Sequence, residues 1–205
     1  HTPTRRQRQM CIRDSSSIDK KPAKKSPTPP FTTSTLQQEA SRKLGFGVTR
    51  TMSTAQKLYE AGLITYMRTD SVTISNEAKS SIVQKIESKY GEDYVNLRDY
   101  KNKNKSAQEA HEAVRPTDIN IEEITSDYDQ QRLYHLIWKR TISSQMSDAQ
   151  IERTVVNIQS DSYNEFFVAR GEVIKFDGFL RVYNEGTDDE IEEEKGVLPV
   201  PVSYT

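Results

Sequence analysis

The sequence predicts an α+β fold, in which a mostly helical region is followed by a partial antiparallel β segment. Between residues 30 and 147, apolar residues recur at helical spacing, and glycines or capping residues bound the stretches. From about residue 150 the pattern changes to β-branched and aromatic runs. At 205 residues and 34% hydrophobic, the chain can build one domain, or one domain and part of another.

Four helices are expected in the first region, over residues 34–45, 51–61, 75–91 and 127–146. Ser34 and Gln37 have the spacing of a capping box, and Gly45 is the expected stop. Ser75 should cap the third helix. On the fourth helix, Trp138 is expected in the core and His135 at the surface.

Three or four antiparallel strands are expected over residues 150–185. Asp177-Gly178 stands between two aromatic and β-branched runs, which is typical of a two-residue hairpin turn. So few strands cannot bury a core alone. The sheet is therefore expected to need partners that this chain lacks.

The two ends carry little apolar patterning. Residues 1–29 are expected to form a disordered basic arm, either a DNA-tracking tail or a linker that is partly non-native. Residues 6–15 and 202–205 resemble translated sequencing-adapter read-through, so the tail at 203–205 is expected to be non-native and the chain a fragment. The acidic run at 188–194 is expected to be a solvated loop.

Charge and cysteine content restrict the function classes. The net charge is −1, and after residue 26 the chain holds 21 bases and 28 acids. The chain therefore lacks the net positive charge that would hold DNA by general attraction. Any nucleic-acid contact must be local. No run approaches the ~18 apolar residues of a membrane span. The single cysteine, Cys11, is compatible with a reducing cytoplasm, and no His/Cys cluster has zinc-ligand spacing.

Tyr66 and Arg68 are the candidate catalytic pair. If the segment is extended, residues two apart lie on one face, so the phenol and the guanidinium would project together. A phenolate can attack a phosphodiester, and a guanidinium can grip two of its oxygens at once. A free phenol has a pKa near 10, so nearby positive charge would be needed to favour the phenolate.

The segment around Tyr66 resembles the active-site motif of the bacterial type IA DNA topoisomerases. Other stretches match the same family in the same order from about residue 30 to residue 200, and the Arg115-Pro116 form is closer to topoisomerase I than to topoisomerase III. The matching stretches are PFTTSTLQQ (30–38), LGFG (44–47), AQKLYEAG (55–62), TYMRTDS (65–71) and AQEAHEAVRPT (107–117).

The resemblance implies a fold and a set of partners. Residues 30–147 would be the tyrosine domain, similar to the catabolite activator DNA-binding domain, and residues 148–202 part of the hinged arch. The family relaxes negative supercoils without ATP, through a transient 5′-phosphotyrosine link to a single DNA strand. Its Mg²⁺ ligands lie in a Toprim domain that this chain lacks, so the chain alone is expected to bind no cofactor and to be inactive. A bacterial enzyme of this kind would be cytoplasmic and nucleoid-associated.

Residue roles follow from the same resemblance. Tyr66 would be the nucleophile, and Arg68 would hold the scissile phosphate. His111 matches an active-site histidine linked to DNA binding, with a capping or packing role as the alternative. Arg115 could contact a phosphate or form a structural ion pair. The positions that line the family's pocket are Gln56, Glu60, Thr65 and Thr69; no metal ligand is expected.

Two other functions compete with this interpretation. A DNA-binding module could reuse the helical scaffold without chemistry. A tyrosine recombinase is the third candidate, but such enzymes surround a late tyrosine with several basic residues, whereas Tyr66 lies early and Arg68 is its only close basic neighbour in sequence.

Overall fold

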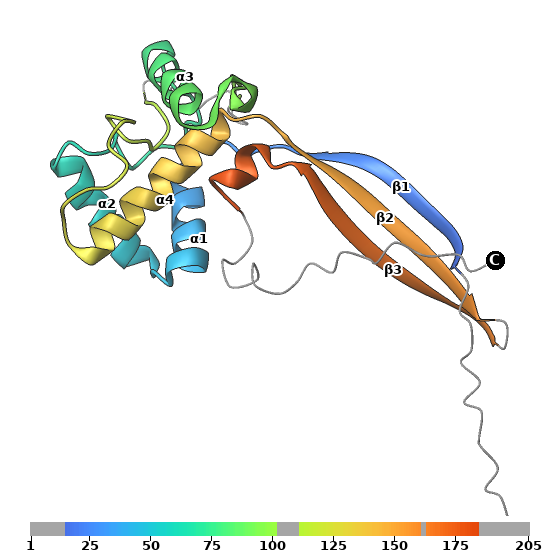
Figure 1. Cartoon of the computed structure of the whole chain (residues 1–205). Coiled ribbons are helices and arrows are strands. Elements are labelled where there is room, and N and C mark those ends of the chain that lie inside the picture. The colour runs from blue at the N-terminus through green and yellow to red at the C-terminus, as the bar shows by residue number, and fades with distance from the viewer. Residues whose placement is uncertain (1–14, 102–110, 161–162, 185–205) are drawn as a thin grey trace, which may run out of the picture. The chain divides into compact units, whose positions relative to one another are not determined.

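A computed structural model describes residues 15–101, 111–160 and 163–184 (Figure 1). The described residues fall into a helical unit of residues 24–149 and 176–184 and a sheet unit of residues 15–23 and 150–175. The predicted α+β fold is confirmed, while the domain limits expected from the sequence stay predictions. The adapter-like stretches up to residue 14 and at 202–205, the acidic run and residues 107–110 of the matched stretch lie outside the described residues.

Four α-helices form the helical unit, as expected. They are α1 (Thr33–Leu44), α2 (Val48–Glu60), α3 (Asn76–Tyr90) and α4 (Tyr128–Ser144), with a short 3₁₀ turn, η1 (Glu92–Tyr94), after α3. Ser75 caps α3 as predicted, and Asp127 caps α4.

The expected capping box of α1 was wrong by two residues. Thr32 is the cap: its hydroxyl accepts a hydrogen bond from the Thr35 amide, while its own amide donates to the Thr35 hydroxyl. The buried Phe31, just before the cap, fixes where the chain enters the helix. Ser34 therefore falls within the first turn, where its side chain is exposed.

The core of the helical unit is built around α4, which packs against α1 and α2 (Figure 1). Leu133, Ile137 and Ile142 are fully buried. Trp138 is 2% exposed, which confirms its core placement, and its indole N–H donates to the Ile119 carbonyl at 2.8 Å. This hydrogen bond removes the cost of burying the indole nitrogen. Among the described residues, no helix is long and apolar enough to cross a membrane.

The sheet has three antiparallel strands in the order β1 (Ser15–Lys25), β2 (Ala149–Ser160) and β3 (Tyr163–Phe176). The expectation of disorder through residue 29 was thus wrong for 15–25. An edge strand is held by main-chain hydrogen bonds to one neighbour, so it can form without an apolar pattern. Pro22 is tolerated in β1 for the same reason.

A strand expected after Asp177-Gly178 is instead the 3₁₀ turn η2 (Gly178–Arg181). A two-residue hairpin of type I′ needs positive φ at both central residues, but Asp177 has φ −75°. The aromatic run that looked like a strand is drawn into the helical core, where Phe179 is 4% and Tyr183 2% exposed. Burial of these two rings replaces the pairing that the sequence suggested.

Gly178 should be the least replaceable glycine of the helical unit. Its φ is +51°, and a Cβ atom there would lie 2.5 Å from the Ser147 carbonyl oxygen. Gly178→Ala should cost roughly 3 kcal/mol, from left-handed strain plus the backbone clash. Gly45→Ala is the matched control: φ is +68° but nothing lies within 4 Å, so about 1 kcal/mol is expected. Urea unfolding followed by circular dichroism would measure both, and equal losses would contradict this account.

Candidate active site

Residues 63–71, which carry Tyr66, form an irregular segment fixed on one side by α1. The Thr33 hydroxyl lies 2.9 Å from the Met67 carbonyl and 3.0 Å from the Thr69 carbonyl, and accepts from the Thr69 amide at 2.8 Å. The Thr33 amide also donates to the Thr69 carbonyl at 2.8 Å. One residue at the first turn of α1 thus holds the backbone on the C-terminal side of Tyr66.

The other side is fixed by the segment 113–117. The Thr65 amide donates to the Arg115 carbonyl at 2.9 Å, and Ile64 forms an antiparallel bridge with Pro116. The Thr65 hydroxyl donates to the Ala113 carbonyl at 2.7 Å and accepts from the Arg115 amide at 2.9 Å. The peptides on both sides of Tyr66 are therefore anchored. Their partners, Thr33 and the 113–115 segment, are far apart in sequence.

Burial alternates along this segment although it is not a regular strand. Met67 is 1% and Thr69 is 8% exposed, whereas Arg68 between them is exposed. Tyr66, on the other side of Met67, is half-buried. Met67 thus points into the core, which leaves its two neighbours toward solvent. Alternating burial of this kind is expected when residues two apart, here Tyr66 and Arg68, lie on one face of the segment.

The Tyr66 ring lies between two other rings. Its centroid is 5.4 Å from that of Tyr59 in an edge-to-face arrangement, and 5.4 Å from the exposed His111 ring. Among the described residues, the Tyr66 hydroxyl has no hydrogen-bond partner and Arg68 forms neither a hydrogen bond nor an ion pair. The structure thus brings together Tyr66 and His111, which are 45 residues apart in sequence.

Gln56 and Glu60 share a face of α2, as their spacing predicted. The Gln56 side-chain amide donates to the Glu60 carboxylate at 2.7 Å. Tyr59, whose ring contacts Tyr66, precedes Glu60 at the end of the same helix. The pair therefore belongs to the helix turn next to the tyrosine, and both groups retain hydrogen-bonding capacity for a ligand.

Thr65 and Thr69 use their hydroxyls to shape the backbone. The Thr65 hydroxyl is engaged by the 113–115 segment, and the Thr69 hydroxyl accepts from the Ser71 amide at 3.0 Å. Both side chains are at least partly buried. This arrangement favours positioning roles for the two threonines over direct contact with a ligand.

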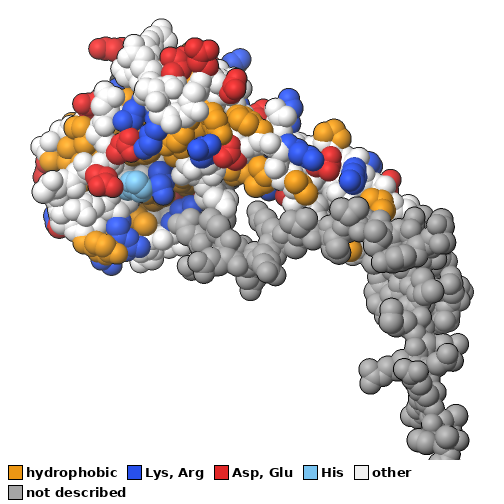
Figure 2. All heavy atoms as spheres, viewed as in Figure 1, with side chains coloured by type: hydrophobic (Ala, Val, Ile, Leu, Met, Phe, Trp, Pro, Cys, Tyr) orange, Lys and Arg blue, Asp and Glu red, His pale blue; other side chains and the backbone are white. Residues whose placement is uncertain are grey.

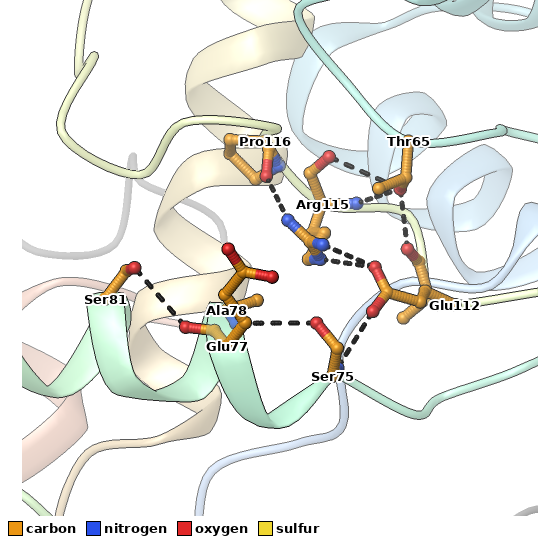
Figure 3. Close-up of polar contacts among 9 residues, drawn as sticks. Thr65, Ser75, Glu77, Ala78, Ser81, Glu112, Arg115 and Pro116 are labelled. Carbon is orange, nitrogen blue, oxygen red and sulfur yellow. Dashed lines mark hydrogen bonds and ion pairs between the residues drawn. The ribbon is translucent and has the colours of Figure 1, made fainter.

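Arg115 is held in an ion pair, one of the two alternatives left open by the sequence (Figure 3). Its Nε donates to the Glu112 carboxylate at 2.8 Å, and its Nη1 donates to the Pro116 carbonyl at 2.9 Å. The other Glu112 oxygen accepts from the Ser75 amide at 2.9 Å, at the cap of α3. Glu112 thus ties the segment after His111 to the start of α3.

The same network lines a hollow of about 260 Å³ between α3, α4 and the 115–119 segment. Glu77, Ser81 and Arg115 are among its lining residues (Figure 3). Tyr66 and Arg68 are not, so this hollow lies apart from the candidate catalytic pair.

Among the described residues of this network, Glu112 is the one whose pKa departs clearly from its usual value. Burial raises the pKa of its carboxyl, but the hydrogen bond from Ser75 and the charge of Arg115 together outweigh burial, so the pKa is lowered. The carboxylate is therefore the form that the fold stabilises.

Comparison with known proteins assigns the family. Residues 8–202 match the DNA topoisomerase family over almost the whole chain. The chain belongs to that family. It is 49% identical over 198 residues to DNA topoisomerase 1 of Rickettsia felis, and 49% identical over 183 residues to the prokaryotic-type DNA topoisomerase 1 of Acanthamoeba polyphaga mimivirus. These alignments cover 89% and 84% of this chain, but only 25% and 21% of the relatives.

A solved structure supports the same family assignment. Full-length topoisomerase I from Thermotoga maritima superimposes with a TM-score of 0.73 at 36% identity, over 85% of this chain and 30% of that protein. The resemblance to bacterial topoisomerase I is confirmed. The chain spans about a quarter of the length of the curated topoisomerases that it matches.

Side chains that could ligate a metal do not gather in groups of three in the described part of this topoisomerase chain. No group of three or more His, Cys, Asp or Glu side chains that could hold a metal ion occurs within residues 15–101, 111–160 and 163–184.

Sequence reasoning missed three residues that shape the site: Thr33, Tyr59 and Glu112. Thr33 lies in the matched stretch 30–38, and Tyr59 in the matched helix before Tyr66, but neither carries a local chemical signal. Glu112 sits three residues before Arg115, a spacing typical of a local ion pair. That spacing was the one available signal.

Thr65→Val should destabilise the helical unit by ~1–3 kcal/mol, because it leaves the Arg115 amide and the Ala113 carbonyl without a partner. Thr65→Ser keeps the hydroxyl and should lose less than half as much. Urea unfolding of both variants tests the positioning role. Equal stability of the valine variant and the parent chain would contradict it.

The lowered pKa of Glu112 predicts an acid-dependent contribution to stability. Its stabilisation is complete above the pKa of the unfolded chain, near 4.5, and is lost as pH falls through the lower folded pKa. Glu112→Gln should therefore be less stable at pH 7, with the deficit shrinking as pH falls below 4.5. Unfolding midpoints across this range, with the exposed Glu87→Gln as the charge control, provide the measurement. A deficit independent of pH would rule the ion-pair explanation out.

Proposed function

We propose that this chain is the tyrosine-bearing part of an ATP-independent type IA topoisomerase, which cleaves one DNA strand through Tyr66. The observation that carries the proposal is the environment of this side chain. Its ring is fixed between Tyr59 and His111, while its hydroxyl has no partner among the described residues. A nucleophile needs a fixed position and an uncommitted oxygen.

The chemistry is a pair of transesterifications. The Tyr66 oxygen attacks the phosphorus, the bond to the 3′ oxygen breaks, and that oxygen leaves as a hydroxyl after taking a proton. The 5′ phosphate remains on the tyrosine, and the reverse attack by the 3′ hydroxyl reseals the strand. One phosphoester replaces another at each step, so resealing requires no ATP.

Arg68 supplies the charge that this reaction needs. An exposed guanidinium without an ion-pair partner among the described residues can grip two non-bridging oxygens of the phosphate in parallel. The negative charge that builds on those oxygens in the transition state is then stabilised.

The other site residues are assigned by what they contact. His111, exposed beside the Tyr66 ring, can donate a hydrogen bond to the phosphate or to the phenol oxygen. Gln56 and Glu60 can hold a nucleotide near the end of α2. Thr65, Thr69 and Arg115 position the segment, since their polar groups are already engaged.

The proposal extends to parts that the described residues do not supply. Mg²⁺ would be held by a Toprim domain of the complete enzyme, and single-stranded DNA would enter between that domain and Tyr66. The same proposal places the enzyme in the bacterial cytoplasm, at the nucleoid. This chain alone is expected not to relax DNA.

Tyr66→Phe tests the proposal in a graft, in which this chain replaces the matching quarter of the Rickettsia felis topoisomerase. The parent graft should trap a labelled oligonucleotide covalently, and Tyr66→Phe should trap none because the attacking oxygen is gone. Tyr59→Phe is the matched control: it removes a neighbouring hydroxyl while keeping its ring, and trapping should persist. Denaturing gel electrophoresis of the trapped complex gives the result.

The alternative, a DNA-binding module without chemistry, makes the opposite forecast. It predicts that neither graft variant changes DNA association and that the parent graft traps no strand. Persistent trapping by Tyr66→Phe would instead move the nucleophile to another residue.

A further inference from the structure

Two adjoining hollows lie on the helical unit away from the Tyr66 segment. The larger, about 420 Å³, and the smaller, about 110 Å³, share Leu44, Arg132 and His135, so they form one continuous groove. The larger end also includes Glu122, Glu123, Ile124 and Gln131, and the smaller end includes Lys43 and Lys139. The larger hollow is within the size range of small-molecule sites.

Basic groups gather at the smaller end. Lys43, Arg132 and Lys139 line it, and no Asp or Glu is among its described lining residues. The Lys43 ammonium already donates to the Asn184 carbonyl and lies 4.6 Å from the Tyr183 ring centroid. Arg132 and Lys139 form no ion pair with another described residue, and the Arg132 guanidinium lies 5.4 Å from the Phe46 ring centroid. Figure 2 shows Lys and Arg side chains beside a histidine on the face that α4 presents to the reader. This end is therefore suited to an anion.

The larger end has a different character. Leu44 and Ile124 give it an apolar lining, while Gln131 and Glu123 supply an amide and a carboxylate. Glu122 is already engaged by Lys85 at 2.8 Å and by Lys89. Burial, and then the charge of Lys139, lowers the pKa of His135, so the imidazole at the junction is neutral at pH 7. An apolar lining with a few polar groups beside it is suited to a flat, uncharged group with a polar edge, such as a nucleobase.

The groove is separated from the candidate catalytic pair by the length of α1. Thr33, at the first residue of this helix, holds the Tyr66 segment, and Leu44, at the last, lines the groove. At 1.5 Å per residue the two ends are about 16 Å apart. A ligand in the groove therefore would not touch Tyr66.

We propose that this groove is a second binding site for single-stranded nucleic acid, with a phosphate at Arg132 and Lys139 and a base over Leu44 and Ile124. A basic groove that follows the phosphate backbone is one of the features by which proteins hold single strands without reading sequence. The site requires no chemistry at Tyr66. It would hold the strand some distance from the cleavage point while the break is open.

An acidic peptide is the competing occupant, and the groove favours the nucleic acid over it. A peptide with carboxylates at regular spacing would place one beside Glu123 in the larger hollow, where the like charges repel. A nucleotide instead presents its phosphate to the basic end and an uncharged base to the acidic end.

The test uses the whole chain carrying Tyr66→Phe, so that no covalent link can form. Fluorescence anisotropy with a fluorescein-labelled oligothymidylate should show about tenfold weaker binding for Arg132→Gln/Lys139→Gln, since two phosphate contacts are lost. The log–log salt slope should fall by about 1.4, because a single strand releases about 0.7 ion per neutralised phosphate. Arg153→Gln/Lys175→Gln, which removes the same two charge types from the sheet, is the matched control.

Photo-cross-linking of a 4-thiothymidine oligonucleotide gives a second measurement that does not depend on variants. Cross-links within residues 131–139 are expected. Cross-links confined to residues 59–68 and 111, equal weakening by the control pair, or equally tight binding of polyglutamate would each overturn the proposal. Its failure would leave covalent trapping by the graft intact, whereas absent trapping with groove binding intact would sink only the strand-cleavage proposal.

Discussion

The arrangement of the site depends on the hydrogen bonds by which two threonine side chains anchor the main chain on either side of Tyr66. Thr33 holds the peptide after it, and the exchange between Thr65 and Arg115 holds the peptide before it. Neither anchor involves the tyrosine side chain. The hydrogen bonds that fix the segment are made by other groups, so the Tyr66 ring is held in place and its hydroxyl is not used to hold it. A site built in this way is positioned precisely while its reactive group stays available.

This constraint explains the division of labour among the polar residues. Side chains that point inward from the segment, such as Thr69, complete backbone hydrogen bonds, and those that point outward, such as Arg68, remain uncommitted among the described residues. Glu112 extends the frame to α3 by joining Arg115 to the Ser75 amide. The segment that carries His111 is thereby tied to the same frame as Tyr66.

Much of the helical unit could be predicted from sequence because its signals are local. Ser75 as a cap, Gly45 as a stop and Trp138 in the core each follow from a short pattern. Failures occurred where long-range packing overrode local chemistry. The run after Gly178 has strand-like residues, but Phe179 and Tyr183 gain more by burial against the helices, and β1 pairs as an edge strand with no apolar signal at all. The candidate catalytic pair was predicted from its spacing and from the family resemblance of the surrounding motif. The anchors around it were not predicted, because a threonine that bonds to a distant carbonyl looks like any other threonine in sequence.

The central claim is that the Tyr66 oxygen and the Arg68 guanidinium meet on one phosphorus atom, and the most direct measurement is the identity of the protein–DNA link. A trapped graft would be digested, and the peptide that carries the nucleotide sequenced by mass spectrometry with differently labelled strand ends. The account predicts a 5′ phosphate on the peptide that contains Tyr66, with a free 3′ hydroxyl on the released strand. A 3′ phosphate link, or a nucleotide on any other residue, would contradict it.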